Sequence, residues 1–285
     1  MIPASFEYVR PKSLDEALAL LAQHGDGAKV LAGGHSLIPM MKLRLAEPDV
    51  LVDIARLPGM AGIAYDAGHR RFTIGALTTH AVLAASADLH THAPALWDAA
   101  NMLGDPQVRN RGTIGGACAH GDPSADYPAV MLALGASFTV AGRNGKRELK
   151  AGEFFRGMFE TALAPGEVLT TVTVDSHPHS AYEKLHHPAS HYALVGVAAR
   201  LGVENGKIHS AHVAITGVGD SAFRASGVEQ ALVGVSTSDA KALAAACTSA
   251  AAGIDARADI QGSAAYRKAM ADVFTQRAVA RAAAR

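Results

Sequence analysis

Two glycine-rich segments carry the clearest chemical potential in this sequence: Ala32-Gly33-Gly34-His35-Ser36 and Thr113-Ile114-Gly115-Gly116-Ala117. Glycine has no Cβ atom and reaches positive φ, so backbone N–H groups in such a segment can converge on an anion such as a pyrophosphate. A helix beginning at Ser36 would add free N–H donors and partial positive charge. A glycine pair can also form nothing more than a turn. Two pairs after short strand-like runs are less readily explained as turns alone. Each segment could hold half of a dinucleotide, but the spacing by itself does not identify the ligand.

The chain has two cysteines, Cys118 and Cys247, which lie far apart and belong to no Cys-x-x-Cys motif. This spacing predicts two free thiols and no disulfide framework. An iron-sulfur cluster normally takes four thiolate ligands. Any iron-sulfur chemistry linked to this protein is therefore expected on another polypeptide.

A third glycine motif, Gly217-Val218-Gly219-Asp220-Ser221-Ala222, fits the Gly-x-Gly-x-x-Ala fingerprint of dinucleotide-binding folds. The strand-like run 213–216 before it reads as part of a hairpin, whereas the fingerprint requires a strand, a helix and a parallel strand in succession. We therefore expect a tight turn here and not a nicotinamide dinucleotide site.

The chain contains 14 histidines, some of them in pairs that could chelate a metal: His90 with His92, His177 with His179, and His186 with His187. No His-Glu-x-x-His motif and no neighbouring cysteine accompany them, so solvated loop histidines are expected. His35 and His120 differ because they lie in the glycine-rich segments and their continuation. Ser36 lacks the Gly-x-Ser-x-Gly context of a hydrolase nucleophile. We predict no catalytic residue and no metal ligand.

The composition indicates a soluble globular protein. Of its 285 residues, 49% are hydrophobic, and Lys plus Arg equals Asp plus Glu at 26 each. Such a balance offers no field that would attract nucleic acid or an anionic membrane. No stretch approaches the roughly 20 apolar residues of a membrane span, and no secretory leader is recognisable. A cytoplasmic location is expected.

The N-terminal region is predicted to alternate short strands and helices. Ser13 and Glu16 have capping-box spacing, and leucines at helical spacing follow, so a helix is expected over 14–23. The second glycine-rich segment is expected to be a loop. A domain boundary is expected at 175–180, where Pro and small polar residues disfavour regular structure. The other expected strands are 29–32, 50–54, 72–75, 137–141 and 168–174, and the other expected helices are 37–45, 81–85, 93–102 and 127–134.

The C-terminal region is predicted to be a small antiparallel sheet packed against helices. Strand-like runs at 192–203 and 207–216 flank Asn205-Gly206, the strongest short hairpin signal. Alanine-rich helices are expected over 238–252 and 264–284. The last helix carries arginines at i, i+4 and i+8, on a face expected to be solvated or to contact another subunit: Arg277, Arg281 and Arg285.

Four stretches of the sequence resemble the FAD-binding medium subunits of the aerobic carbon monoxide dehydrogenase type, in the molybdenum hydroxylase and xanthine dehydrogenase family. They are FEYVRPKSLDEALALL, AGGHSLIPMMKLRLA (32–46), RNRGTIGGACAHGDPSADYPA (109–129) and EKLHHPASHYALVGVAA. The resemblance covers nearly the whole chain. It implies an α+β fold with a two-lobed FAD-binding domain of the PCMH or vanillyl-alcohol-oxidase type at 1–175. A flavoprotein C-terminal domain would follow at 181–285, with FAD extended between the lobes and that domain.

The resemblance also implies the residues that bind FAD. Backbone groups of the two glycine-rich segments would hold the pyrophosphate and the ribityl chain, and Asp126 would accept hydrogen bonds from cofactor hydroxyls. Lys184 and Tyr192 would lie near the isoalloxazine. The full expected set is Ala32, Gly33, Gly34, His35, Ser36, Thr113, Ile114, Gly115, Gly116, Ala117, His120, Asp122, Asp126, Lys184 and Tyr192.

Two departures from the family pattern bear on these expectations. The family's second segment usually reads TIGGN, and Ala117 stands in place of the Asn, so one side-chain contact worth about 1 kcal/mol would be missing. The family's carbon monoxide enzymes tend to carry a Lys-x-Lys-x-Gly-Asp run where this chain has 185–191, LHHPASH. This difference weakens the case for carbon monoxide as the substrate.

By resemblance, the chain is an electron-transfer subunit. A large molybdopterin-binding subunit would oxidise the substrate, a small subunit with [2Fe-2S] clusters would pass the electrons on, and the FAD of this chain would deliver them to an external acceptor. A dimer of such heterotrimers is expected. Two alternatives remain open: a self-sufficient FAD-dependent oxidoreductase of the same fold, and a scaffold subunit without flavin. Arg109 and Arg111 could offset pyrophosphate charge or form surface ion pairs.

Overall fold

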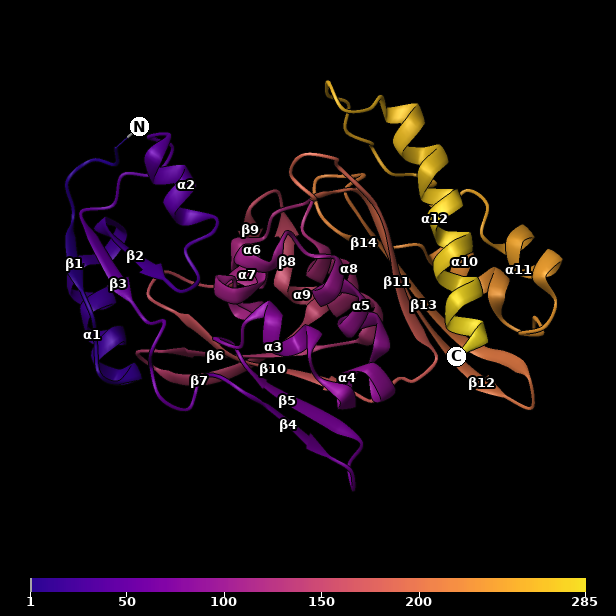
Figure 1. The fold of residues 1–285 in the computed structure, drawn as a ribbon, viewed down its shortest axis with the longest axis horizontal. Coiled ribbons are helices and arrows are strands. Elements are labelled where there is room, and N and C mark those ends of the chain that lie inside the picture. The colour runs from indigo at the N-terminus through magenta and orange to yellow at the C-terminus, as the bar shows by residue number, and fades with distance from the viewer. Residues whose placement is uncertain (1) are drawn as a thin grey trace.

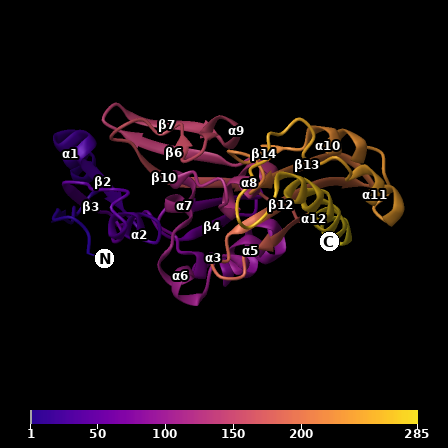
Figure 2. The same ribbon diagram turned by 90° about the horizontal axis from the view of Figure 1, so that it is seen from above.

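The computed structural model describes residues 2–285 as three regions that follow one another along the chain (Figure 1). An N-terminal lobe contains a small parallel sheet, a middle lobe contains a larger antiparallel sheet, and the C-terminal region contains a third sheet between helices. The view from above shows the same order, with the middle lobe between the other two (Figure 2). The predicted α+β class is confirmed.

The N-terminal lobe is a three-stranded parallel sheet in the order β1-β3-β2. Ala17 and Leu21 pack against Val50 and Val52 in its small core. Ser13 accepts a hydrogen bond from the backbone N–H of Glu16, which fixes the start of α1 as the capping spacing predicts. The elements are β1 (Glu7–Val9), α1 (Leu14–His24), a 3-10 turn (Gly25–Gly27), β2 (Ala28–Leu31), α2 (Leu37–Lys42) and β3 (Val50–Asp53).

The middle lobe is a five-stranded antiparallel sheet in the order β4-β5-β10-β6-β7. Its helices lie together on one side of the sheet (Figure 1), and every residue of α8 is buried. Its strands are β4 (Ile63–Asp66), β5 (Arg71–Gly75), β6 (Ser137–Gly142), β7 (Gly145–Lys150) and β10 (Val168–Asp175), with the short pair β8 (Phe155–Gly157) and β9 (Glu160–Thr161). Its helices are α3 (His80–Ala84), α4 (Ala87–His92), α5 (Pro94–Met102), α6 (Pro106–Arg111), α7 (Ile114–His120), α8 (Asp126–Leu134) and α9 (Ala151–Phe154).

The C-terminal region is a four-stranded antiparallel sheet in the order β11-β12-β13-β14. Helices α5 and α8 of the middle lobe pack on one part of this sheet, and α10 and α12 also pack on it, with α11 against α12. The predicted hairpin at Asn205-Gly206 is confirmed, because Glu204 pairs with Lys207. The elements are β11 (Ser180–His186), β12 (Ala193–Glu204), β13 (Lys207–Thr216), β14 (Phe223–Arg224), α10 (Ser226–Leu232), α11 (Ala240–Ala246) and α12 (Ala264–Ala284).

A buried carboxylate joins the middle lobe to the C-terminal helix. The side chain of Asp98, on α5, is fully buried and lies 2.8 Å from Arg281 and 2.7 Å from Arg285. It also accepts a hydrogen bond of 3.2 Å from the backbone N–H of Tyr182 on β11. Arg281 and Arg285 are therefore not simply solvated, because both pair with a carboxylate in the interior.

Several sequence-based predictions of local structure were wrong. The segment Thr113–Ala117 is not a loop: it caps and begins α7, and α6 precedes it. Helix α11 is shorter than the predicted 238–252. The elements that were missed are strands β1, β4, β7, β8, β9, β11 and β14 and helices α4, α6, α9 and α10. The third glycine motif is a turn between the antiparallel strands β13 and β14, as expected. Both cysteines are free and buried. Among residues 2–285, no helix has the length and apolar character that crossing a membrane would need.

Candidate functional site

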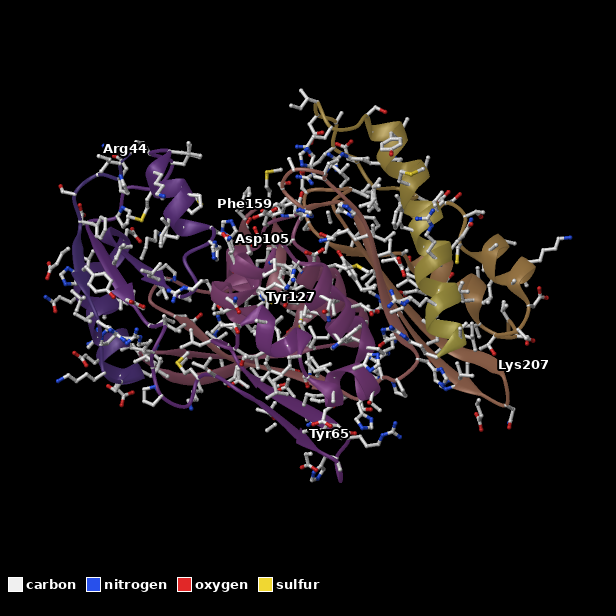
Figure 3. All side chains as sticks on the ribbon, in the orientation of Figure 1. Arg44, Tyr65, Asp105, Tyr127, Phe159 and Lys207 are labelled. Carbon is white, nitrogen blue, oxygen red and sulfur yellow. The ribbon has the colours of Figure 1, made fainter. Side chains whose placement is uncertain are left out.

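A groove runs between the N-terminal and middle lobes and reaches the loop before β12. It consists of two cavities of about 460 and 160 Å³. Every site residue expected from the sequence lines one or both of them, except Ile114, Gly115 and Lys184. Figure 3 labels one residue that lines each cavity, Phe159 for the larger and Tyr127 for the smaller. The cavities meet at the residues that line both: His35, Ser36, His80, Ala117 and His120.

The first glycine-rich segment leaves β2 and crosses directly over the start of the second. A Cβ atom on Gly33 would lie 2.7 Å from the Cα atom of Gly112 and would also clash with the carbonyl oxygen of Arg111. Gly34 has a φ of +78°, a conformation that glycine adopts without strain. Glycine at position 33 therefore lets the two lobes meet backbone to backbone, and glycine at position 34 permits the turn that follows.

Four consecutive backbone N–H groups in the first segment have no hydrogen-bond acceptor within residues 2–285: those of Gly33, Gly34, His35 and Ser36. All four residues line the larger cavity. Gly33, Gly34 and Ser36 are half-buried and His35 is exposed, so water can reach these donors in the free chain. A run of four such donors beside a cavity is also available to an anionic ligand.

The second glycine-rich segment is helical because of its capping and packing. The hydroxyl of Thr113 accepts from the backbone N–H of Gly116 at 3.1 Å and starts α7. Gly115 faces inward, where its Cβ atom would lie 2.7 Å from the carbonyl oxygen of Ala76. Ile114 and Gly115 therefore anchor the helix in the core and do not reach the groove. Gly116 and Ala117 are on the side that lines the larger cavity.

Asp126 lies at the inner end of the groove in a network of polar side chains. Its Oδ1 atom accepts from the hydroxyl of Tyr182 at 2.5 Å and lies 2.9 Å from the ammonium of Lys184. Burial raises the pKa of the Asp126 carboxyl, and the neighbouring Lys184 opposes that shift. Since both bonds fall on Oδ1, Oδ2 is left to accept from a ligand in the smaller cavity, which Asp126 lines.

Lys184 is not at the groove surface. Its ammonium donates to the carbonyl oxygens of Met102 at 2.8 Å and His191 at 2.9 Å, in addition to its ion pair with Asp126. Its side chain is 1% exposed. Lys184 therefore orients Asp126 and the loop that carries Tyr192, which does line the smaller cavity.

Three expected residues that line the smaller cavity are Asp122, His120 and Tyr192. Asp122 closes the turn after α7 by accepting from the backbone N–H of Ser124 at 2.8 Å. The ring of His120 lies 5.1 Å from that of Phe159, centroid to centroid. Burial lowers the pKa of His120 and raises that of Tyr192. Both shifts favour the neutral forms of the His120 ring and the Tyr192 hydroxyl.

Arg109 has neither of the two roles left open by the sequence. Its guanidinium donates to the carbonyl oxygens of Leu103 at 3.1 Å and Gly104 at 3.2 Å, so it shapes the loop before α6. The described residues that line the two cavities include one lysine, Lys29, and no arginine.

Of the groove residues outside the expected set, two have a side chain of particular interest: His80 and Phe159. His80 lines both cavities, although nothing in its spacing distinguishes it from the other histidines. Phe159 lines the larger cavity from the turn between β8 and β9, with a φ of +57°. An aromatic residue at positive φ is uncommon, but the sequence alone does not reveal such a conformation.

The groove fits an extended dinucleotide such as FAD. It is long, it presents free backbone N–H groups to a pyrophosphate, and it has an inner carboxylate oxygen for sugar-type hydroxyls. The contact between Gly33 and Gly112 would be lost with any side chain at Gly33.

No cluster of three or more His, Cys, Asp or Glu side chains in residues 2–285 is arranged to hold a metal ion.

Comparisons with known proteins agree with this geometry. Residues 4–176 match the family model described as FAD binding domain in molybdopterin dehydrogenase, and residues 180–282 match the CO dehydrogenase flavoprotein C-terminal domain. The chain is 41% identical to the carbon monoxide dehydrogenase medium chain of Hydrogenophaga pseudoflava, over 100% of this chain and 99% of that one. It is 38% identical to the 6-hydroxypseudooxynicotine dehydrogenase complex subunit alpha of Paenarthrobacter nicotinovorans, over 99% of this chain and 96% of the relative.

A solved structure extends the likeness to three dimensions. It is that of the carbon monoxide dehydrogenase from Hydrogenophaga pseudoflava which lacks the Mo-pyranopterin moiety of the molybdenum cofactor. The TM-score is 0.93 at 42% identity, with 100% of this chain and 99% of the matched chain covered. With both parts of its length matched and the groove in place, this chain belongs to the family of FAD-binding flavoprotein subunits of molybdopterin dehydrogenases, of the carbon monoxide dehydrogenase medium-chain type.

Proposed function

We propose that this chain binds FAD noncovalently in the groove and serves as the electron outlet of a heteromeric molybdenum hydroxylase. The observation that carries the proposal is the run of four unpaired backbone N–H groups from Gly33 to Ser36, at the cavity that α7 also lines. An extended pyrophosphate placed there would satisfy these donors. Bound flavin supplies an electron carrier that accepts electrons singly and releases them singly or in pairs.

The residues of this chain hold and orient the cofactor, and none acts as a general acid or base in the proposal. Backbone groups at 33–36 and at Gly116 and Ala117 would hold the pyrophosphate and ribityl section. Asp126 Oδ2 would accept from hydroxyls, and Tyr192 would lie against the isoalloxazine. Lys184 would act from behind, since it fixes Asp126 and the carbonyl of His191. Ala117 contributes its backbone only.

The substrate is chosen elsewhere in the complex. The relatives named for carbon monoxide and for 6-hydroxypseudooxynicotine are 41% and 38% identical to this chain, so the degree of similarity to this subunit depends little on the molecule that each complex oxidises. Large molybdopterin-binding and small iron-sulfur subunits are the proposed partners, arranged as a dimer of heterotrimers. We also propose that residues 1–175 and 181–285 are separate domains. The ion pairs of Asp98 with Arg281 and Arg285, here called the clasp, join them.

Reconstitution of the complex tests this function. The purified complex should be yellow-brown, and acid precipitation should release the flavin as FAD. A complex assembled with a Gly116→Val subunit should lose FAD, because the new Cβ atom would lie 2.8 Å from the Thr113 hydroxyl and crowd residues that line the larger cavity. Substrate should still reduce the molybdenum and iron-sulfur centres in one turnover, while steady-state transfer to the acceptor collapses. Gly116 replaces Gly33 in this test because Gly33 also holds the lobes together.

The two alternatives predict different outcomes. A self-sufficient oxidoreductase would turn over the substrate as an isolated chain at the rate of the whole enzyme. A scaffold subunit would be colourless with its partners and would not bind added FAD. Full steady-state flux in the FAD-free complex would also refute the electron-outlet role.

A further inference from the structure

His80 is buried where the two cavities of the groove meet. It is 3% exposed and lines both cavities. Its backbone N–H donates to the carbonyl oxygen of Gly112 at 3.0 Å, and the preceding Thr79 forms an isolated β-bridge with Thr113. The imidazole is therefore held against the start of α7, beside the segment proposed to receive the pyrophosphate and ribityl section.

One ring nitrogen of His80 is paired with a buried tyrosine. Nδ1 lies 2.9 Å from the hydroxyl of Tyr127, a residue with no exposed surface. No other described residue forms a hydrogen bond with that hydroxyl. If Nδ1 carried the proton, the tyrosine O–H would have no acceptor, at a cost of about 1–3 kcal/mol for an unsatisfied buried group. The hydroxyl therefore donates to Nδ1, and the ring proton is on Nε2.

The Nε2–H group has no acceptor within residues 2–285. This atom lies over Gly112, where an added Cβ atom would be 2.6 Å from it. Gly112 and Thr113 line the larger cavity together with His80. The ring is buried, its other nitrogen is paired, and Nε2–H is without a protein acceptor at residues that line the cavities, so this donor is available to an acceptor supplied by the ligand.

We propose that His80 binds the cofactor as a neutral hydrogen-bond donor, with Tyr127 setting its tautomer so that Nε2–H is presented to an oxygen of the pyrophosphate–ribityl section. This inference rests on the proposed FAD site and adds a residue to it. Tyr127 is a positioning residue, because it acts on the ligand only through His80. Burial is the main reason that the pKa of His80 falls to about 3, and His35 and Arg109 lower it further, so the ring adds no charge to the groove at neutral pH.

Two isosteric variants separate the roles of the ring nitrogens. His80→Asn keeps an amide near the Nδ1 position and loses the Nε2 donor, whereas His80→Gln places an amide near Nε2. Titration of the deflavinated protein with FAD should show about tenfold weaker binding for His80→Asn, since one hydrogen bond is lost, and binding within about threefold of wild type for His80→Gln. Tyr127→Phe should weaken binding by less than His80→Asn. His90→Asn, at an exposed ring packed on Trp97, is the matched control and should bind FAD as wild type does.

Nitrogen-15 NMR of histidine-labelled protein gives a readout that does not depend on binding. The His80 resonances, assigned by their loss in His80→Gln, should report the neutral Nε2–H tautomer and should shift when FAD is added. A neutral Nδ1–H tautomer or a protonated ring at pH 7 would overturn the proposal, as would wild-type FAD affinity in a folded His80→Asn variant. Absence of FAD binding by the wild-type protein would instead refute the proposed function itself.

Discussion

The Cα atom of Gly112 lies 2.7 Å from the position that a Cβ atom of Gly33 would occupy. The two glycines belong to different lobes, and their contact closes the floor of the groove. A side chain at Gly33 would therefore separate the lobes as well as fill part of the cofactor site. This relationship differs from the simple expectation of a flexible phosphate-binding loop, in which only ligand binding would suffer.

The first prediction follows from that contact. Gly33→Ala should lower the free energy of unfolding by about 1–3 kcal/mol, as overpacking against backbone atoms does, and should reduce the flavin content of the purified protein. Gly227→Ala is the matched control, because a Cβ atom there would meet nothing within 4 Å. At that helical position alanine should stabilise by about 0.5–1 kcal/mol. Urea denaturation of both variants gives the comparison, and equal stabilities would contradict it.

The second prediction concerns the clasp on Asp98. Asp98→Ala removes the carboxylate that Arg281 and Arg285 share. Since both arginines are partly exposed and Arg281 keeps its pair with Glu183, the loss should be about 1.5–3 kcal/mol, as for a hydrogen bond to a charged group. Chemical denaturation should show this loss in the C-terminal region. Asp175→Ala removes the partner of Arg71 in a pair whose side chains are 52% and 54% exposed, and should cost at most about 1 kcal/mol. A larger effect at Asp175 than at Asp98 would show that the clasp is not structural.

The third prediction separates the buried pair of Lys184 and Asp126. Lys184→Met should destabilise the protein by about 3–5 kcal/mol, because it leaves a buried carboxylate without its cation. The double variant Lys184→Met, Asp126→Asn should recover much of this loss, since it removes both charges. It should still bind FAD poorly if Asp126 Oδ2 contacts the cofactor. Thermal denaturation with FAD titration measures both quantities, and strictly additive stability losses would refute the coupling.

The fourth prediction is a loss of stability in mild acid. Nε2 of His177 lies 3.0 Å from the guanidinium of Arg200. Burial, and then the charge of Arg200, lower the pKa of His177 to about 4, although the nearby Asp175 opposes this shift. Burial, Arg200 and Arg224 together lower the pKa of His212 to about 4. In the unfolded chain, both histidines have a pKa of about 6.5. The stabilising contribution is thus full above about pH 6.5 and is lost as the pH falls toward about 4.

The measurement is Tm as a function of pH between 7 and 4.5. His177→Gln should flatten this profile, since glutamine can accept from Arg200 without titrating. A substitution at the exposed His209 should leave the slope unchanged. An unaltered slope in His177→Gln would mean that other groups cause the acid sensitivity.

Sequence patterns predicted elements whose cause is local. Asn205-Gly206 makes a tight turn through its own backbone preferences, and Ser13 caps the helix that follows it. The glycine pair at 115 and 116 was read as a loop because glycine is a poor helix former. The cap at Thr113 and the packing of Gly115 on Ala76 outweigh that preference.

Features that depend on distant partners were not predictable. His80 gains its role from Tyr127, 47 residues away, and Asp98 gains its partners from arginines 183 and 187 residues further along the chain. Strand β11 contains Lys184 and Glu183, and its strand character comes from pairing with β12. Family resemblance supplied most of the expected residues that line the groove, but it also included Lys184, whose side chain is buried beside Asp126 and lines neither cavity.

The meeting of two lobes at Gly33 and Gly112 has a consequence for the supply of working subunit in a cell. A ligand held by both lobes acts as a thermodynamic crosslink: free FAD at 100 times its Kd adds about 2.7 kcal/mol to the stability of the folded chain. Flavin shortage would then lower the abundance of the subunit itself through faster turnover of the unfolded chain. Production of the intact hydroxylase would thereby be tied to flavin availability without any dedicated regulator.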